Sequence, residues 1–92
     1  MREREIEAKL KREVEKRGGL CFKFLSSVSG VPDRILLFAG GVLVFVELKK
    51  EGGKPRKLQE VQMRKISELG FRVQVIDSEQ GIQELMREID EG

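Results

Sequence analysis

The spacing of hydrophobic residues predicts three amphipathic helices along the chain. Apolar residues recur every three or four positions over residues 3–17, about 56–69 and 78–91, with charged residues between them. Glycines follow the first two segments, as is common just past the end of a helix. The residues expected to point inward are Ile6, Leu10 and Val14, then Leu58, Val61, Ile66 and Leu69, and finally Ile82, Leu85, Met86 and Ile89.

Four short apolar segments between these helices predict strands. They are residues 20–25, 34–38, 42–49 and 71–76. The stretch 42–46 is apolar on both faces, so we expect a central strand that is covered on both sides. The order α-β-β-β-α-β-α predicts one α/β domain over residues 1–92, with helices on both faces of a mixed four-stranded sheet.

A hairpin at Gly40-Gly41 joins the second and third strands, and its register decides whether two acidic residues can meet. A loop of two residues would turn Asp33 and Glu47 to opposite faces of the sheet. A loop of three residues places Asp33 directly opposite Glu47. Such loops commonly end in a left-handed glycine, which Gly41 could supply, so we expect the odd-length loop.

Three polar side chains then predict a site for a divalent metal ion. Glu47 and Lys49 lie two apart on one strand and share a face, and Asp33 would join them across the hairpin. A carboxylate in a central strand is costly to desolvate unless a cation compensates it. Two carboxylates suit Mg²⁺, with Mn²⁺ as a substitute, and such an ion can activate water beside a phosphate. The alternative is that the three residues form solvated ion pairs at strand ends.

The composition narrows the class of protein. The chain has no histidine and one cysteine, which excludes Ser-His-Asp and Cys-His catalytic groups, a CxxC zinc site and an internal disulfide. The net charge is only +2, so a nucleic-acid surface must come from local clusters of basic residues. The N-terminus does not resemble a signal peptide, and no apolar run is long enough to cross a bilayer. We therefore expect a soluble cytoplasmic protein without a membrane partner or a small-molecule cofactor.

Three short motifs follow one another along the chain. They are Gly30-Val31-Pro32-Asp33-Arg34, Phe45-Val46-Glu47-Leu48-Lys49 and Pro55-x-x-Leu58-Gln59. Together they resemble the VRR-NUC family, the virus-type replication-repair nucleases of the PD-(D/E)XK superfamily, over nearly the whole chain. The resemblance implies a restriction-endonuclease-like αβββαβ core with one extra C-terminal helix. It also implies a magnesium-dependent DNA endonuclease of the stand-alone phage type, acting in the cytoplasm of a bacterium or of a phage-infected host.

The resemblance assigns roles to individual residues. Asp33 and Glu47 would be metal ligands, the backbone carbonyl of Leu48 would add a third oxygen, and Lys49 would be the catalytic lysine.

Two further assignments come from the family pattern alone. Glu7 would complete the acidic set, in contact with the metal directly or through water, and Gln59 would match the family glutamine. Periodicity leaves both open, because Glu3 and Glu13 also flank the first apolar stripe. Gln62 lies nearer the centre of its own stripe than Gln59 does.

Basic residues near the expected site predict contacts with DNA. Phosphate contacts require cations but no particular spacing. The candidates are Lys50, Lys54, Arg56 and Lys57, with Arg34, Arg64 and Lys65 as weaker ones. Any one of them could instead be a solvated surface charge.

The absence of a base-reading motif favours selection of DNA by its shape. The PD-(D/E)XK superfamily includes Holliday-junction resolvases of similar size, so we expect cleavage of four-way junctions. A symmetric homodimer would supply two matched sites. The alternatives are a nicking or flap endonuclease in DNA repair, a non-catalytic DNA-binding module on a nuclease fold, and a metal-binding structural subunit of a replication complex.

Overall fold

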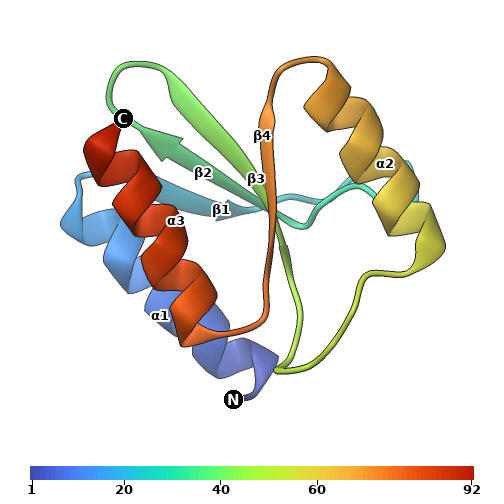
Figure 1. Ribbon diagram of the computed structural model, residues 1–92, viewed down its shortest axis with the longest axis horizontal. Coiled ribbons are helices and arrows are strands. Elements are labelled where there is room, and N and C mark those ends of the chain that lie inside the picture. The colour runs from blue at the N-terminus through green and yellow to red at the C-terminus, as the bar shows by residue number, and fades with distance from the viewer.

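The computed structural model covers residues 1–92, and its elements follow the predicted order (Figure 1). They are α1 (Glu3–Lys16), β1 (Leu20–Lys23), β2 (Arg34–Phe38), β3 (Val42–Leu48), α2 (Lys57–Glu68), β4 (Arg72–Ile76) and α3 (Glu79–Glu91). The observed ends lie within one or two residues of the predicted ones. No helix is long and apolar enough to span a bilayer.

The four strands form one mixed sheet in the order β1-β2-β3-β4. The first three strands are antiparallel neighbours, whereas β3 and β4 are parallel because α2 connects them as a crossover. The predicted central place of β3 is confirmed, since it lies between β2 and β4.

The β2–β3 hairpin has the predicted three-residue loop. Phe38 pairs with Val42, which leaves Ala39, Gly40 and Gly41 in the turn. Both glycines have positive φ, 83° and 75°, a region that residues with a side chain rarely adopt. The turn therefore depends on glycine at two consecutive positions.

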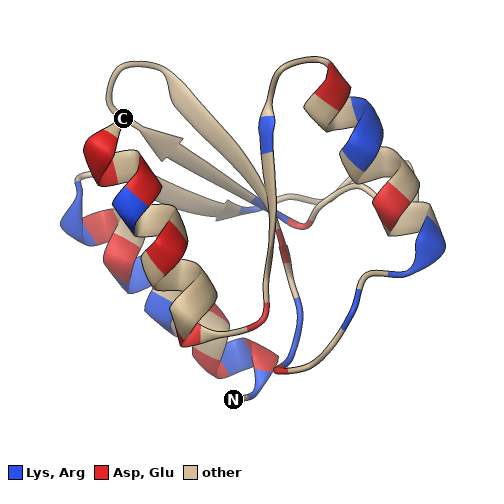
Figure 2. Ribbon diagram, in the orientation of Figure 1, with Lys and Arg blue, Asp and Glu red and all other residues tan.

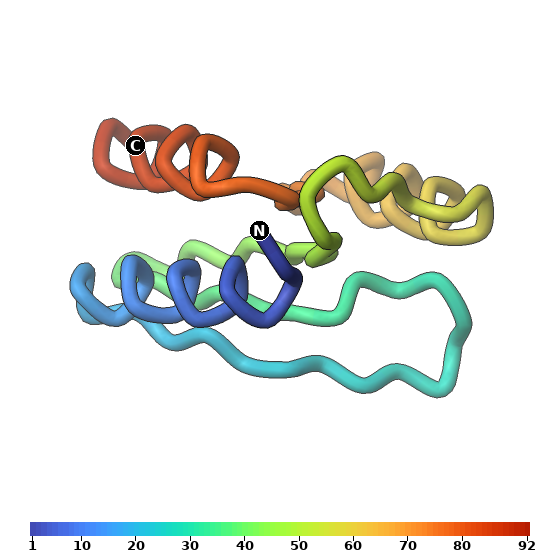
Figure 3. The backbone as a smooth tube through the Cα atoms, turned by 90° about the horizontal axis from the view of Figure 1, so that it is seen from below, coloured from blue at the N-terminus to red at the C-terminus, as the bar shows by residue number.

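One face of the sheet is closed by α1 and α3, which lie together on the same side (Figures 1 and 3). Ion pairs between Lys9 and Glu79 and between Arg17 and Asp90 link the two helices. All the buried apolar residues of the core belong to this layer. They are Ile6, Leu10, Val14, Leu36, Val44, Val46, Leu48, Ile76, Ile82, Leu85 and Met86. The inward residues predicted for the first and last helices are thus confirmed, with Ile89 partly buried.

The opposite face is covered only in part, because α2 packs mainly along β4 (Figure 1). Strand pairing and ring contacts identify two apolar rows here, Phe22-Ile35-Phe45-Val73 and Leu20-Leu37-Leu43 with Phe71. None of these eight side chains is buried, and we call them the open sheet face. The prediction that β3 is covered on both sides was therefore wrong for this face. Leu58 of α2 and Leu69 directly after it, both predicted to point inward, are 50% and 76% exposed.

Gly30 lies in the loop between β1 and β2, where the backbone comes close to that of Leu58 at the start of α2. Its φ is 89°, and a Cβ at this position would lie 2.8 Å from the carbonyl oxygen of Leu58. Only glycine allows this approach of two backbones, and the loop leads directly into Asp33.

We expect Gly30→Ala to lower the free energy of unfolding by about 3 kcal/mol, because it combines left-handed strain with a backbone clash. Gly40→Ala is the matched control. Its φ is similar but nothing lies within 4 Å of the added Cβ, so strain alone should cost about 1 kcal/mol. Urea unfolding followed by circular dichroism measures both values. Equal losses would show that the contact with α2 does not constrain the loop.

Candidate active site

The hairpin register places two carboxylates opposite each other. Arg34 pairs with Val46, so Asp33, one residue before β2, stands opposite Glu47. Alternation along β3 keeps Lys49 on the same face as Glu47. The register predicted for Asp33 and Glu47 is therefore confirmed.

The backbone of Leu48 faces the same pair. Its N–H donates to Asp33 Oδ1 at 3.2 Å, whereas the N–H of Lys49 turns the other way and donates to the Ile76 carbonyl at 3.0 Å. In an extended strand the N–H and C=O of one residue point to the same side. The Leu48 carbonyl therefore also points toward the side of Asp33. Strand β2 begins only at Arg34, which pairs with Val46, so Leu48 lies beyond the end of this strand pairing.

Glu47 is buried, with 4% of its surface exposed, and its surroundings disfavour its charge. Burial raises the pKa of Glu47, and the negative charge of Asp33 raises it further. Lys49 acts in the opposite direction, with its Nζ 3.5 Å from Glu47 Oε2. The site is thus short of positive charge, a deficit that a bound cation would correct.

Gln59 holds the Glu47 carboxylate from the α2 side. Its Nε2 donates to Glu47 Oε2 at 3.0 Å, and its Oε1 accepts from the Arg56 backbone N–H at 2.8 Å. Both ends of the amide are bonded, so its orientation is fixed. Gln59 is the buried residue of α2, whereas Gln62 is only partly buried. Of the two glutamines weighed from the sequence, the structure brings Gln59 to the acidic pair.

Glu7 is connected to this pair only through Arg34. The Glu7 carboxylate pairs with the Arg34 guanidinium. That group in turn donates to the Asp33 carbonyl at 2.9 Å and lies 3.3 Å from Asp33 Oδ2. The structure contains no cluster of three or more histidine, cysteine or acidic side chains that could hold a metal ion. Arg34 also differs from its predicted place at the DNA surface, because it is buried and paired.

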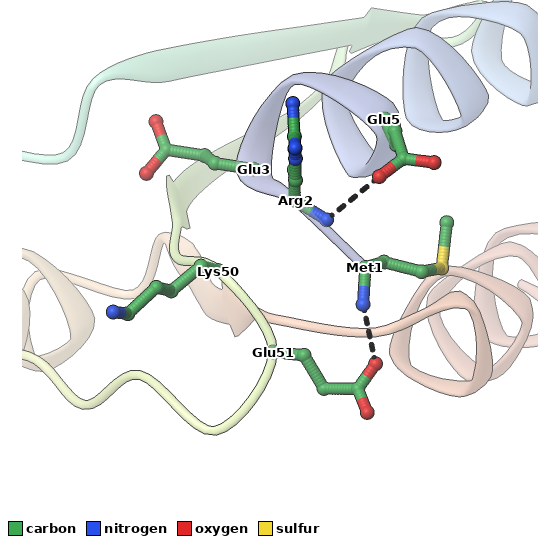
Figure 4. Close-up of a pocket in the computed structure, with 6 residues that line it drawn as sticks. All are labelled: Met1, Arg2, Glu3, Glu5, Lys50 and Glu51. Atoms are coloured by element: carbon green, nitrogen blue, oxygen red, sulfur yellow. Dashed lines mark hydrogen bonds and ion pairs between the residues drawn. The ribbon is translucent and has the colours of Figure 1, made fainter.

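The other two glutamates considered on the first helix lie elsewhere. Glu13 pairs with Lys16 and Arg17 near the far end of α1. Glu3 lines a pocket of about 700 Å³ with Lys50 and Glu51, and Figure 4 shows Glu3 and Lys50 extending toward the same side of it. Neither glutamate contacts Asp33 or Glu47.

Basic residues occur along the loop after β3 and at the start of α2 (Figure 2). This segment runs past the acidic pair, because Gln59 in its first helical turn contacts Glu47. The four cations predicted for DNA contact here are exposed and take part in none of the ion pairs of the structure. They are Lys50, Lys54, Arg56 and Lys57. Arg64 and Lys65 are also exposed, further along α2.

The chain is similar to known proteins in both sequence and structure. The chain is 41% identical over 80 residues to a protein described as "Putative nuclease p44" from Acyrthosiphon pisum secondary endosymbiont phage 1, with 86% of each chain covered. A solved structure described as "VRR_NUC domain" superposes with a TM-score of 0.86 at 30% identity, covering 92% of this chain and 94% of that chain. No protein-family model matches the chain.

Replacing Gln59 should reveal its contribution to the site. Gln59→Leu leaves the buried Glu47 carboxylate and the Arg56 N–H without their partner, so the free energy of unfolding should fall by about 1–3 kcal/mol. Gln62→Leu, in the same helix, should change it by less than about 0.5 kcal/mol. Denaturant titration of both variants measures the difference, and a larger effect at Gln62 would reverse the assignment.

The raised pKa of Glu47 predicts how the metal-free protein responds to pH. A carboxyl whose folded pKa exceeds its unfolded value stabilises the protein fully at low pH. That contribution is lost as pH rises through the folded pKa. As the pH rises from the unfolded-state pKa of Glu47 through its folded-state pKa, wild type should therefore lose stability relative to Glu47→Gln. Asp33→Asn should lower the pKa of Glu47, because it removes a negative neighbour. Carboxyl ¹³C NMR titration measures this shift, and an unchanged midpoint in Asp33→Asn would contradict the coupling.

Proposed function

This chain belongs to the VRR-NUC family, and we propose that it is a divalent-metal-dependent DNA endonuclease that hydrolyses phosphodiester bonds. The observation that carries the proposal is the meeting of Asp33, Glu47, the Leu48 carbonyl and Lys49 at one end of β3. Family membership supports the nuclease class. The metal, the substrate and the residue roles below are our proposals.

The donor set fits magnesium, with manganese as a substitute. The carboxylates of Asp33 and Glu47 and the carbonyl of Leu48 are hard oxygen ligands of the type that both ions prefer. Burial and the charge of Asp33 both raise the pKa of Glu47, and a bound cation would offset both effects. When bound, the ion would lower the pKa of a water molecule and offset charge on the phosphate.

The remaining side chains have separate tasks. The Lys49 ammonium stands beside Glu47, where it can donate to a phosphate oxygen and stabilise the negative charge that develops there. Gln59 orients the Glu47 carboxylate. Arg34 orients Asp33, and Glu7 acts through Arg34 or through a water molecule.

Exposed cations beside the acidic pair would bind the DNA backbone. Lys50, Lys54, Arg56 and Lys57 contact phosphates, which carry no sequence information. Binding should therefore weaken with salt and select DNA by shape rather than by base sequence.

We further propose that the preferred substrate is a four-way junction, cut by a homodimer with two matched sites. The phage origin of the related p44 protein is compatible with processing or repair of replicating DNA in a bacterial cytoplasm. A nicking or flap endonuclease is the second candidate, because the exposed cations would bind any of these DNAs.

A cleavage panel tests the proposal. Single-stranded, duplex, flapped and four-way-junction DNAs are incubated with Mg²⁺, Mn²⁺ or a chelator. We expect symmetric nicks in the junction, dependent on metal. Asp33→Asn, Glu47→Gln and Lys49→Met should each reduce the rate by at least about 100-fold. Lys16→Met, at the far end of α1, is the matched control and should leave the rate unchanged.

The outcomes separate the candidate functions. Equal cutting of flaps or plain duplex would retain the nuclease and remove the junction preference. Metal-independent binding of all four DNAs without any cleavage would favour the non-catalytic module.

A further inference from the structure

A cavity of about 210 Å³ lies between α1 and the first two strands, next to the acidic pair but outside it. We call it the α1–β1 pocket. Its lining residues are Glu7, Lys11, Cys21, Lys23 and Arg34. Three of them carry a positive charge and one carries a negative charge, so the pocket has a surplus of two positive charges.

Strand pairing places two of these cations directly opposite each other. Lys23 pairs with Arg34, so both side chains extend from the same face of the sheet. Like charges at such positions repel each other and destabilise a sheet. Lys23 is exposed and forms no ion pair that would offset this repulsion. An anion bound between the two side chains would offset it.

The carboxylate of the pocket leaves this surplus in place. Glu7 stands four residues before Lys11 on α1, a spacing at which glutamate and lysine commonly pair. The Glu7 carboxylate pairs with Arg34 instead, and Lys11 is exposed without an ion-pair partner. Arg34 forms its hydrogen bonds to Asp33 and Glu7 through the two terminal nitrogens. Its Nε forms none, and since no buried polar atom lacks a partner, this N–H is accessible to a ligand.

The α1–β1 pocket lies at the same end of the sheet as the acidic pair. Antiparallel pairing brings the end of β1, the start of β2 and the end of β3 together there. Lys23 is two strands away from Glu47, which corresponds to about 10 Å between their Cα atoms at the usual strand spacing. A DNA strand advances about 3.4 Å per nucleotide, so this distance corresponds to about three nucleotides.

We propose that the α1–β1 pocket binds a backbone phosphate of the DNA, about three nucleotides from the bond that is cut. This inference rests on the proposed function, because it takes DNA as the substrate. Lys11 and Lys23 would contact the phosphate from α1 and β1, and the Arg34 Nε–H would donate to it from the floor of the pocket.

This subsite would give the DNA a second point of attachment. The acidic pair lies on β2 and β3, between the pocket on the β1 side and the exposed cations of the segment from Lys50 to Lys57 after β3. A strand bound at both places is held on each side of the bond to be cut. Such positioning reduces the freedom that the substrate must lose before reaction.

Binding of a short DNA duplex in the presence of a chelator tests the subsite without any contribution from metal or cleavage. Lys11→Met and Lys23→Met should each weaken binding about 10-fold in fluorescence anisotropy titrations. Each should also reduce the slope of log Kd against log salt concentration by about 1, because a phosphate contact is lost. Lys16→Met is the matched control. It removes the same charge at the far end of α1, where Lys16 pairs with Glu13, and it should change neither quantity.

Urea unfolding separates a binding role from a structural one. Lys23→Met removes the repulsion from Arg34, so the unfolding midpoint of the free protein should stay the same or rise while DNA affinity falls. A midpoint that falls together with the affinity would assign Lys23 a structural role and overturn the proposal.

Two further results would overturn it. They are variants at Lys11 and Lys23 that bind as tightly as Lys16→Met, and weaker binding with an unchanged salt slope. Cleavage is measured separately with Mg²⁺. Metal-dependent cleavage by a protein whose DNA binding does not depend on the pocket would retain the nuclease and remove the subsite. Pocket-dependent binding by a protein that cuts no DNA would do the reverse.

Discussion

The site depends on the β2–β3 turn having an odd number of residues. β3 is apolar on both faces, so hydrophobic burial alone discriminates weakly between registers that differ by one residue. The turn selects the register. Gly40 and Gly41 adopt left-handed conformations, which allow a loop of three residues between Phe38 and Val42. A slip of one position would turn Glu47 toward α1 and away from Asp33. The chemistry of the protein thus rests on two residues without side chains, at the end of the hairpin remote from the carboxylates.

The same geometry forces two negative charges together, and the fold opposes their repulsion from both sides of the sheet. Arg34 reaches Asp33 from the α1 side, where it also binds Glu7. Gln59 reaches Glu47 from the α2 side, and the N-cap backbone of that helix holds its other end. Each carboxylate is therefore oriented by a side chain on a different layer. Such preorganisation is what an electrostatic site requires before its ligand arrives.

Local patterns in the sequence were sufficient for the elements, the hairpin register and the pairing of Asp33 with Glu47, because each depends on spacing along one or two strands. They did not predict the burial or the partners of a side chain whose neighbours belong to another layer of the fold. Leu58 and Leu69 have helical spacing, but spacing does not say how completely α2 is covered. Arg34 follows Asp33 directly, so alternation turns its side chain to the opposite face, where a glutamate from α1 meets it. That partner, and the exposure of one sheet face, depend on the packing of distant segments.

The one-sided core gives the molecule two mechanically different halves. The hydrophobic core cluster lies between the sheet and α1 with α3, so that layer should resist opening. Helix α2, in contrast, has Gln59 as its buried residue and is held by few buried contacts. Regions with little buried apolar surface open at low free energy while the rest of a protein stays folded. Glu47 belongs to the sheet of the well-packed layer. Gln59 and the basic residues around it belong to α2 and the loop before it, which have little buried apolar surface. If these basic residues bind DNA as proposed, the contacts with DNA are made by the part of the protein that opens most easily, and the metal-binding carboxylates belong to the part that does not.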